Sequence, residues 1–279
     1  MKKIFFLLAL SFSALLGAKE PSGPAQLTVM SYNIRYGDAQ DGTNSWQYRY
    51  PASYSMIMDQ QPDILGLQEA LDYQVKFLEE YCKNYKCVGV GRENGKHEGE
   101  HMSIFYNKKK IRLIKWGTFW LSETPSKPSL GWDGACYRTA TWALMEATSS
   151  NRKFFYVNTH LDHVGVEARK NGLALIQQKI AELNPEGYPV VVTGDFNMTQ
   201  DSPELEEFGK SMSNARKTAM KTDNNITYHG WGKKEASQQI DHIYYNGFSS
   251  CMVFEVVTKS YNTLKYISDH YPVKAVLLF

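Results

Sequence analysis

Residues 190–197 read Val-Val-Val-Thr-Gly-Asp-Phe-Asn, a short apolar run that ends abruptly on polar residues. A run rich in Val and Thr is typical of a β-strand, and the glycine marks its end. Runs of the same form recur along the chain, which predicts a strand-rich fold. We expect strands at Leu27–Ile34, Asp63–Gln68, Met102–Tyr106, Ile111–Leu121, Cys136–Met145, Phe154–Thr159, Val190–Thr193, Ile240–Tyr245, Met252–Val257 and Val273–Phe279.

A few helices separate these strands. The clearest is expected at Val166–Leu183, where apolar residues recur at spacings of three and four and Pro185 follows the end. Shorter helices are expected at Pro51–Gln60 and Tyr73–Tyr81. Many strands with few helices, in one domain of this size, predict an α/β protein of two stacked sheets with helices on the outer faces.

The N-terminus has the features of an export signal. Lys2-Lys3 precedes the apolar run Ile4–Leu16 and the small residues Gly17-Ala18. The run is too short to cross a bilayer core, which needs about 20 apolar residues. We therefore expect residues 1–18 to be a signal peptide. Residues 19–279 would form a single catalytic domain, periplasmic or extracellular, with no transmembrane segment.

Charge and cysteine content restrict the function classes. Loss of residues 1–18 lowers Lys+Arg from 31 to 29, against 29 Asp+Glu, so the mature chain is formally neutral. A dedicated nucleic-acid binder would be more basic. The cysteine spacing does not resemble a zinc site. Cys82 and Cys87 could form a disulfide in an exported chain, or all four cysteines could be small buried side chains.

Polar side chains stand where the apolar runs end. Taken singly, each could be a cap or a turn former. Taken together, they supply hard oxygen ligands and two histidines with potential carboxylate partners, and no serine or cysteine nucleophile motif accompanies them. The residues at these ends are Asn33, Glu69, His160, Asp195, Asn197, Asp241, Asp269 and His270.

The chain resembles the endonuclease/exonuclease/phosphatase superfamily, whose motifs correspond in order to MSYNIR, LQE, GEHMSIFY, YRTATWA, NTHLD, GDFN, IDHI and SDHYP. That superfamily includes pancreatic-type deoxyribonucleases, abasic-site endonucleases, deadenylases, inositol polyphosphate 5-phosphatases and neutral sphingomyelinases. The resemblance covers essentially the whole chain after the signal. Within the superfamily, WLSETPSKPSLGWDGACYRTATWA is most similar to uncharacterised exported bacterial members. The resemblance implies a four-layered α/β/β/α sandwich of two mixed sheets with outer helices.

The resemblance also implies a metal site. It makes Glu69 the principal metal ligand, with Asn33 and Asp269 close by. Mg²⁺ suits such a site, because it keeps several waters and needs only one or two protein carboxylates besides the phosphate oxygens. Mn²⁺ could substitute, since it accepts the same hard ligands.

Catalytic roles follow from the same resemblance. Asp195 matches the residue that orients and deprotonates the attacking water, and Asn197 would fix its position or contact the phosphate. His270 matches the histidine that contacts the phosphate, with Asp241 as its carboxylate partner. Either Asp195 or His270 could take the proton of the water, and we favour Asp195.

A second pair resembles the leaving-group side of the deoxyribonucleases. It consists of His160 and Glu100, with the histidine near the leaving oxygen. Arg138 corresponds to a basic residue near the same place.

Six further residues are weaker candidates for binding the substrate. Asp162 could face the substrate, or it could stand at the positive end of a helix dipole. Trp132 lies in the irregular stretch Ser122–Gly134 and could form an aromatic wall. His229 resembles a residue of a loop near the active site in relatives, and packing within the loop would explain it equally well. A second irregular stretch is expected at Lys210–Thr227. The candidates are Tyr106, Trp132, Asp162, His163, Arg169 and His229.

Three functions are compatible with these residues. The first is an exported Mg²⁺-dependent phosphoesterase that hydrolyses a small or lipid-linked phosphate ester by direct attack of an activated water. The alternatives are an exported metal-dependent nuclease and a binding protein that has lost catalysis. The neutral charge favours the first over the nuclease, because a polynucleotide requires many cationic contacts. The natural substrate and the oligomeric state stay open.

Overall fold

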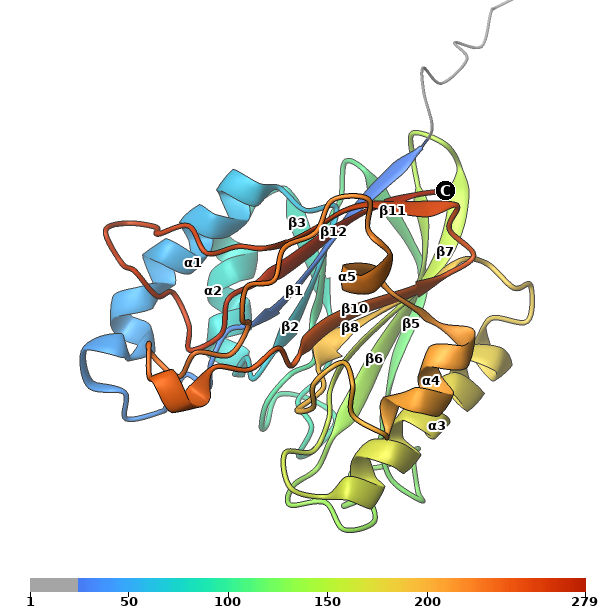
Figure 1. Ribbon diagram of the computed structural model, residues 1–279, viewed down its shortest axis with the longest axis horizontal. Helices are drawn as coiled ribbons and strands as arrows, with labels where there is room; N and C mark the ends of the chain where they lie inside the picture. Colours follow the sequence, from blue (N-terminus) through green and yellow to red (C-terminus); the bar gives the residue numbers. More distant parts are fainter. Residues whose placement is uncertain (1–24) are drawn as a thin grey trace, which may run out of the picture.

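Two six-stranded sheets form the centre of the protein (Figure 1). The computed structural model describes residues 25–279, so the expected signal peptide lies outside the described residues. The first sheet has the order β11(Ser250–Val256), β12(Val273–Leu278), β1(Gln26–Asn33), β2(Ile64–Gln68), β4(Ile104–Asn107) and β3(Tyr85–Val88). The second has the order β5(Ile111–Trp120), β6(Thr139–Ala147), β7(Arg152–His160), β8(Val190–Asp195), β10(Asp241–Asn246) and β9(Ser213–Asn214).

Both sheets are mixed. Each contains one parallel pair, β1 with β2 in the first sheet and β7 with β8 in the second, and the other neighbours are antiparallel. The carboxyl ends of two strands therefore meet in each sheet. This arrangement places strand carboxyl ends of both sheets at an edge of the sandwich, where ligands commonly bind.

Helices cover the outer face of each sheet. Helices α1(Trp46–Gln60) and α2(Asp72–Tyr81) pack on the first sheet, and α3(Val166–Leu183) and α4(Leu205–Ser211) pack on the second. A short helix α5(Ala215–Thr218) and two 3₁₀ turns, Gly42–Asn44 and Lys234–Ala236, complete the elements. The predicted four-layered α/β/β/α sandwich is confirmed.

Period-two alternation explains the layers. In β1, Leu27 and Val29 face the second sheet, whereas Met30 and Tyr32 face the helices. In β8, Val191 faces inward and its neighbours on either side face α3 and α4. Successive side chains of a strand point to opposite faces, so both faces of these central strands must be apolar.

Some element predictions need correction. Strands β3 and β9 were not predicted, and the stretch Lys210–Thr227 contains β9 and α5 instead of being irregular. Strand β9 exists only through its pairing with Tyr244 and Tyr245 of β10, a contact that local sequence cannot reveal. Helix α1 begins at Trp46 and not at Pro51, although a proline inside a helix removes one intrahelical bond and crowds the preceding turn.

The cysteines and the helices answer two questions that the sequence left open. All four cysteines are free, and Cys82 and Cys251 are buried as small apolar side chains. None of the helices in the described part of the chain has the length and apolar character needed to span a membrane.

A buried polar contact fixes how the two sheets face each other. Gln68 Nε2 donates to Asn158 Oδ1 at 2.6 Å, and Asn158 Nδ2 donates to the carbonyl oxygen of Leu67 at 2.7 Å. Gly66 lets the sheets come this close, because a Cβ at this position would lie 2.7 Å from Thr193 Oγ1 and would overlap Asn158. Satisfied polar contacts of this kind specify one arrangement of a core.

We predict that Gly66→Ala destabilises the protein by about 1–3 kcal/mol, because the added methyl group forces the sheets apart. The measurement is urea unfolding of the protein that begins at Lys19. Gly209→Ala is the matched control, since Gly209 lies in α4 with open space around its Cβ position. It should leave stability unchanged or raise it by up to about 1 kcal/mol. Equal midpoints for the two variants would contradict the role given to Gly66.

Candidate active site

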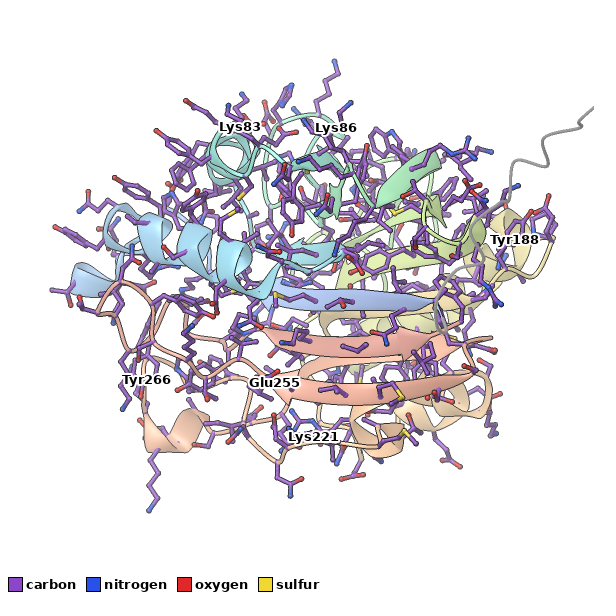
Figure 2. All side chains as sticks on the ribbon, turned by 90° about the horizontal axis from the view of Figure 1, so that it is seen from above. Lys83, Lys86, Tyr188, Lys221, Glu255 and Tyr266 are labelled. Atoms are coloured by element: carbon purple, nitrogen blue, oxygen red, sulfur yellow. The ribbon has the colours of Figure 1, made fainter. Side chains whose placement is uncertain are left out.

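The site lies at the edge where the parallel strand pairs end. Asn33 stands beside Gln68 at the ends of β1 and β2, and His160 stands beside Asp195 at the ends of β7 and β8. Figure 2 shows Tyr266, on the loop that leads to Asp269, at the opposite end of the molecule from Tyr188, which precedes β8. Both sheets therefore deliver their polar strand ends to the same side.

Asn33 joins the two sheets at this edge. Its Nδ2 donates to Glu69 Oε1 at 2.9 Å and to Asp195 Oδ2 at 3.0 Å, and its Oδ1 accepts the N–H of Arg35. The amide nitrogen, and not the oxygen, thus faces the two carboxylates. In this arrangement Asn33 positions Glu69 and Asp195, and it would have to turn its amide over to act as the predicted metal ligand.

Three residues at the strand ends have left-handed backbones. Their φ angles are 68° at Arg35, 61° at Glu69 and 52° at Asn197. Such conformations cost on the order of 1–3 kcal/mol for residues other than glycine. Side-chain contacts hold two of them, since Glu69 Oε2 accepts the N–H of Tyr36 at 2.7 Å and Asp195 Oδ1 accepts the N–H of Asn197 at 2.9 Å. The bends turn these side chains into the pocket.

His270 is held as a cation. Its Nδ1 lies 2.8 Å from Asp241 Oδ2, and its Nε2 lies 3.6 Å from Asp195 Oδ2. Burial opposes the charged imidazole, but the carboxylates of Asp241 and Asp195 outweigh it and raise the pKa of His270 to about 10. The backbone N–H of Asp241 is fixed in turn by Thr227 Oγ1.

Asp195 lies between two histidines. Its Oδ2 is 3.5 Å from His160 Nε2, about the same as its distance from His270. Burial raises the pKa of Asp195 to about 7, with the charge of His270 acting against the rise and that of Asp241 adding to it. A carboxylate with a pKa near neutrality can accept and release a proton, which suits the predicted base.

His160 is held neutral. Burial, helped by the charges of Arg138 and Arg92, lowers the pKa of His160 well below its ordinary value. Its Nε2 accepts a hydrogen bond from Asn197 Nδ2 at 2.9 Å, which leaves the proton on Nδ1, 3.9 Å from Glu100 Oε2. Glu100 is bonded to Arg92 at 2.9 Å. The predicted pair of His160 and Glu100 is thus brought together, although loosely.

Arg138 and His163 form one wall of the pocket, where Arg138 Nη2 lies 3.0 Å from His163 Nδ1. Asp162 lies behind them and accepts the N–H groups of Ala135, Val164 and Gly165. Although burial opposes its ionisation, these bonds lower the pKa of Asp162 to about 2. Asp162 therefore anchors the start of α3. This agrees with the prediction that it stands at the positive end of a helix dipole, and not with the prediction that it faces the substrate.

Like Asp162, four other weaker candidates lie outside the pocket, and their predicted role in binding the substrate needs correction. Tyr106 is in the core between the sheets, opposite Ile64 at the far end of β2. Arg169 pairs with Glu204 at 3.1 Å. His229 is buried between the rings of Tyr266 and Tyr271. Trp132 lies in the Ser122–Gly134 loop, where its backbone N–H donates to the carboxylate of Glu123.

The pocket has a volume of about 530 Å³. Sequence reasoning missed several of its lining residues. Arg35 could have been found from its place two residues after Asn33 in MSYNIR, whereas nothing in the local sequence singles out the others. The missed residues are Arg35, Tyr36, Arg92, Cys136, Tyr228, Gln238 and Ile240.

The donor set suits a divalent cation. Ligand atoms of Glu69, His160 and Asp195 lie within 4.8 Å of one another, and Asp269 lines the same pocket. Burial raises the pKa of Asp269, which the neighbouring charge of Glu69 raises further while His270 and Arg35 oppose it. Crowded carboxylate oxygens are hard ligands that a divalent cation would stabilise.

Several solved structures share the fold of this chain. An endonuclease/exonuclease/phosphatase from Bacteroides vulgatus is 38% identical to this chain. The match covers 91% of this chain and 100% of the other, with a TM-score of 0.86. A mannosyl-6-phosphatase from Bacteroides thetaiotaomicron is 33% identical, with coverage of 91% and 100% and the same TM-score. D. rerio TDP2 complexed with a single-strand DNA product shares the fold at 17% identity, with coverage of 91% and 100% and a TM-score of 0.72.

The family model agrees with the structural neighbours. The model of the Endonuclease/Exonuclease/phosphatase family matches residues 30–270. The match extends from the middle of β1 to His270, and so includes the site residues on both sheets. The chain therefore belongs to the Endonuclease/Exonuclease/phosphatase family.

Proposed function

We propose that this protein is an exported Mg²⁺-dependent phosphoesterase that hydrolyses a small or lipid-linked phosphate ester by direct attack of water. Members of the family are metal-dependent hydrolases. The observation that carries the proposal is the position of Asp195 between a neutral and a charged histidine. Export rests on the signal features of residues 1–18.

Each residue of the site has a separate role in the proposed reaction. Glu69 and Asp269 would hold the cation, which supplies Lewis-acid stabilisation of the phosphate oxygens when bound. Asp195 accepts the proton of the attacking water. The charged His270 donates a hydrogen bond to the phosphate, where negative charge grows in the transition state. His160 orients Asn197, and in this state it has no proton on Nε2 to give to a leaving group. The leaving oxygen would therefore depart as an alkoxide when the P–O bond breaks and take its proton from solvent water.

Charge in the pocket favours a small substrate. Three arginines line it, and each is already paired: Arg35 with Asp41, Arg92 with Glu100, and Arg138 with Asp162 and His163. A polynucleotide needs several cations free to neutralise phosphates. The likeness to a mannosyl-6-phosphatase supports a hexose phosphate as a first substrate to test.

We predict that activity depends on Glu69 through the metal. Glu69→Gln should abolish hydrolysis and weaken Mn²⁺ binding, because it removes the charged ligand. EDTA should stop the parent enzyme, and Mg²⁺ or Mn²⁺ should restore it. Glu80→Gln, on the exposed face of α2, is the control and should behave like the parent. Normal turnover of Glu69→Gln at limiting Mg²⁺ would show that the metal is held elsewhere.

A second prediction concerns pH. Hydrolysis should need ionised Asp195 and protonated His270, so kcat should rise with pH through a value at or below about 7 and fall near 10. The acid limb lies at or below 7 because a bound cation lowers the pKa of a neighbouring carboxylate. Asp195→Asn should cut kcat about 10²–10⁴-fold and remove the acid limb. A variant that keeps this limb would assign it to another group.

The third prediction separates the phosphoesterase from the nuclease. The enzyme should hydrolyse hexose phosphates and phospholipid headgroups faster than it nicks plasmid DNA, with weak dependence on salt. Initial rates on both substrate classes between 50 and 200 mM NaCl are the measurement; the range is that over which nucleic-acid affinity drops steeply, about 10³–10⁵-fold for six to ten phosphate contacts. Efficient plasmid cleavage that collapses across this range would favour the nuclease.

A further inference from the structure

Arg49 is a buried cation beneath the active site. It belongs to α1, its side chain is 1% exposed, and within residues 25–279 it has no ion-pair partner within 4.0 Å. Its guanidinium instead donates to three backbone carbonyl oxygens, those of Asn44 at 2.6 Å, Ile34 at 2.9 Å and Ile267 at 2.8 Å. One arginine thus joins the neighbouring segments at Ile34 and Asn44 to Ile267, which is far away in the sequence.

Such a group is a poor choice for stability alone. Burying a cation without a carboxylate partner is costly, and even a complete buried ion pair can often be replaced by apolar residues without loss of stability. Carbonyl oxygens and aromatic faces offset part of the cost here, since the guanidinium carbon lies 5.5 Å from the ring centre of Trp46 and 5.3 Å from that of Trp231. The arrangement therefore points to a functional reason for the charge.

Two of the three carbonyl oxygens belong to segments that carry metal-site residues. Ile34 directly follows Asn33, and Ile267 lies two residues before Asp269. The same two loops are also joined by Ser268 Oγ, which donates to the carbonyl oxygen of Asn33 at 2.7 Å. Tyr32 adds a further link, because its hydroxyl donates to the carbonyl oxygen of Ile267 at 3.1 Å. Arg49 thus acts together with these contacts to hold the two loops in register.

The aromatic partner extends the contact to a third loop. Trp231 has a φ of 64°, a conformation that a residue with a side chain rarely adopts. In the residues just before it, the N–H groups of His229 and Gly230 donate to the carbonyl oxygen of Asp269 at 3.0 and 3.1 Å. Arg49 is therefore linked to the main chain of Asp269 indirectly by two routes, through the carbonyl oxygen of Ile267 and through the loop of Trp231.

We infer that Arg49 is a positioning residue. It sets the distance between the pair Asn33 and Glu69 on one side of the pocket and Asp269 on the other, and this distance determines the affinity of the pocket for its divalent cation. This inference rests on the metal site of the proposed function. Residues that orient metal ligands commonly affect metal affinity or activity by about 10- to 100-fold.

The segment Asp41–Arg49 acts as one unit in this role. Asp41 binds Arg35 through two bonds of 2.9 and 3.0 Å, and Arg35 Nη1 in turn lies 3.3 Å from Asp269 Oδ2. Arg49, at the other end of the segment, holds the backbone beneath the same carboxylate. The side chain and the main chain of Asp269 are thus both tied to one short stretch of sequence.

The test is direct measurement of Mn²⁺ affinity, by electron paramagnetic resonance without substrate, on folded protein. Arg49→Met should weaken binding about 10- to 100-fold. Arg49→Lys keeps the cation but cannot reach three carbonyl oxygens, so its Mn²⁺ affinity should fall less than that of Arg49→Met. This variant provides the test if Arg49→Met does not fold. In turnover assays, both variants should regain much of their kcat at saturating Mg²⁺.

Arg216→Met is the matched control. Arg216 is also buried, donates to the carbonyl oxygens of Asp223 and Asn225, and stacks on Phe254 at 4.6 Å, but it touches no metal-site residue. It should lose stability and keep its Mn²⁺ affinity. If folded Arg49→Met and Arg49→Lys bind Mn²⁺ as tightly as the parent, Arg49 is merely structural and the inference is wrong. If the parent itself binds no Mn²⁺, the proposed function fails instead.

Discussion

The hydrogen bond between Gln68 and Asn158 crosses the interior between the two sheets, at a point where Gly66 leaves room for it. Everything in the pocket depends on this register, because the site is assembled from both sheets. Glu69 directly follows Gln68, and two residues beyond Asn158 the second sheet presents His160 beside Asp195. Asn33 completes the connection by donating to one carboxylate from each sheet. A shift of one sheet against the other would separate the base from the metal-binding carboxylate.

Burial then gives chemically similar groups different protonation states. His160 and His270 lie at nearly equal distances from the same oxygen of Asp195. His270 also has Asp241 at 2.8 Å and is charged, whereas His160 has a carboxylate only at 3.9 Å and two arginines nearby, and is neutral. A neutral and a charged imidazole on either side of one carboxylate can have separate roles, His160 in orienting Asn197 and His270 in binding the phosphate. The difference arises from neighbours contributed by distant parts of the chain.

The loops around the site carry the conformational cost of this arrangement. Left-handed backbones at Arg35, Glu69 and Asn197 are strained, and they persist because the surrounding contacts over-determine them. The unpaired charge of Arg49 is a second cost, placed under the loops of Asn33 and Asp269. Strain and buried charge concentrated at one edge are expected where function, and not stability, selects the residues. The remaining core follows ordinary alternation and apolar packing.

Several features could be derived from the sequence alone. Strand periodicity is local, so the ten expected strands and the sandwich follow from it, and the polar residues at the strand ends identified most of the site. The two-residue strand β9, the pocket residue Arg92 and the exclusion of Tyr106 could not be derived. Each depends on which distant segments pack together. Protonation states and the amide orientation of Asn33 likewise belong to the tertiary structure, because burial and neighbouring charge exist only once the sheets have met.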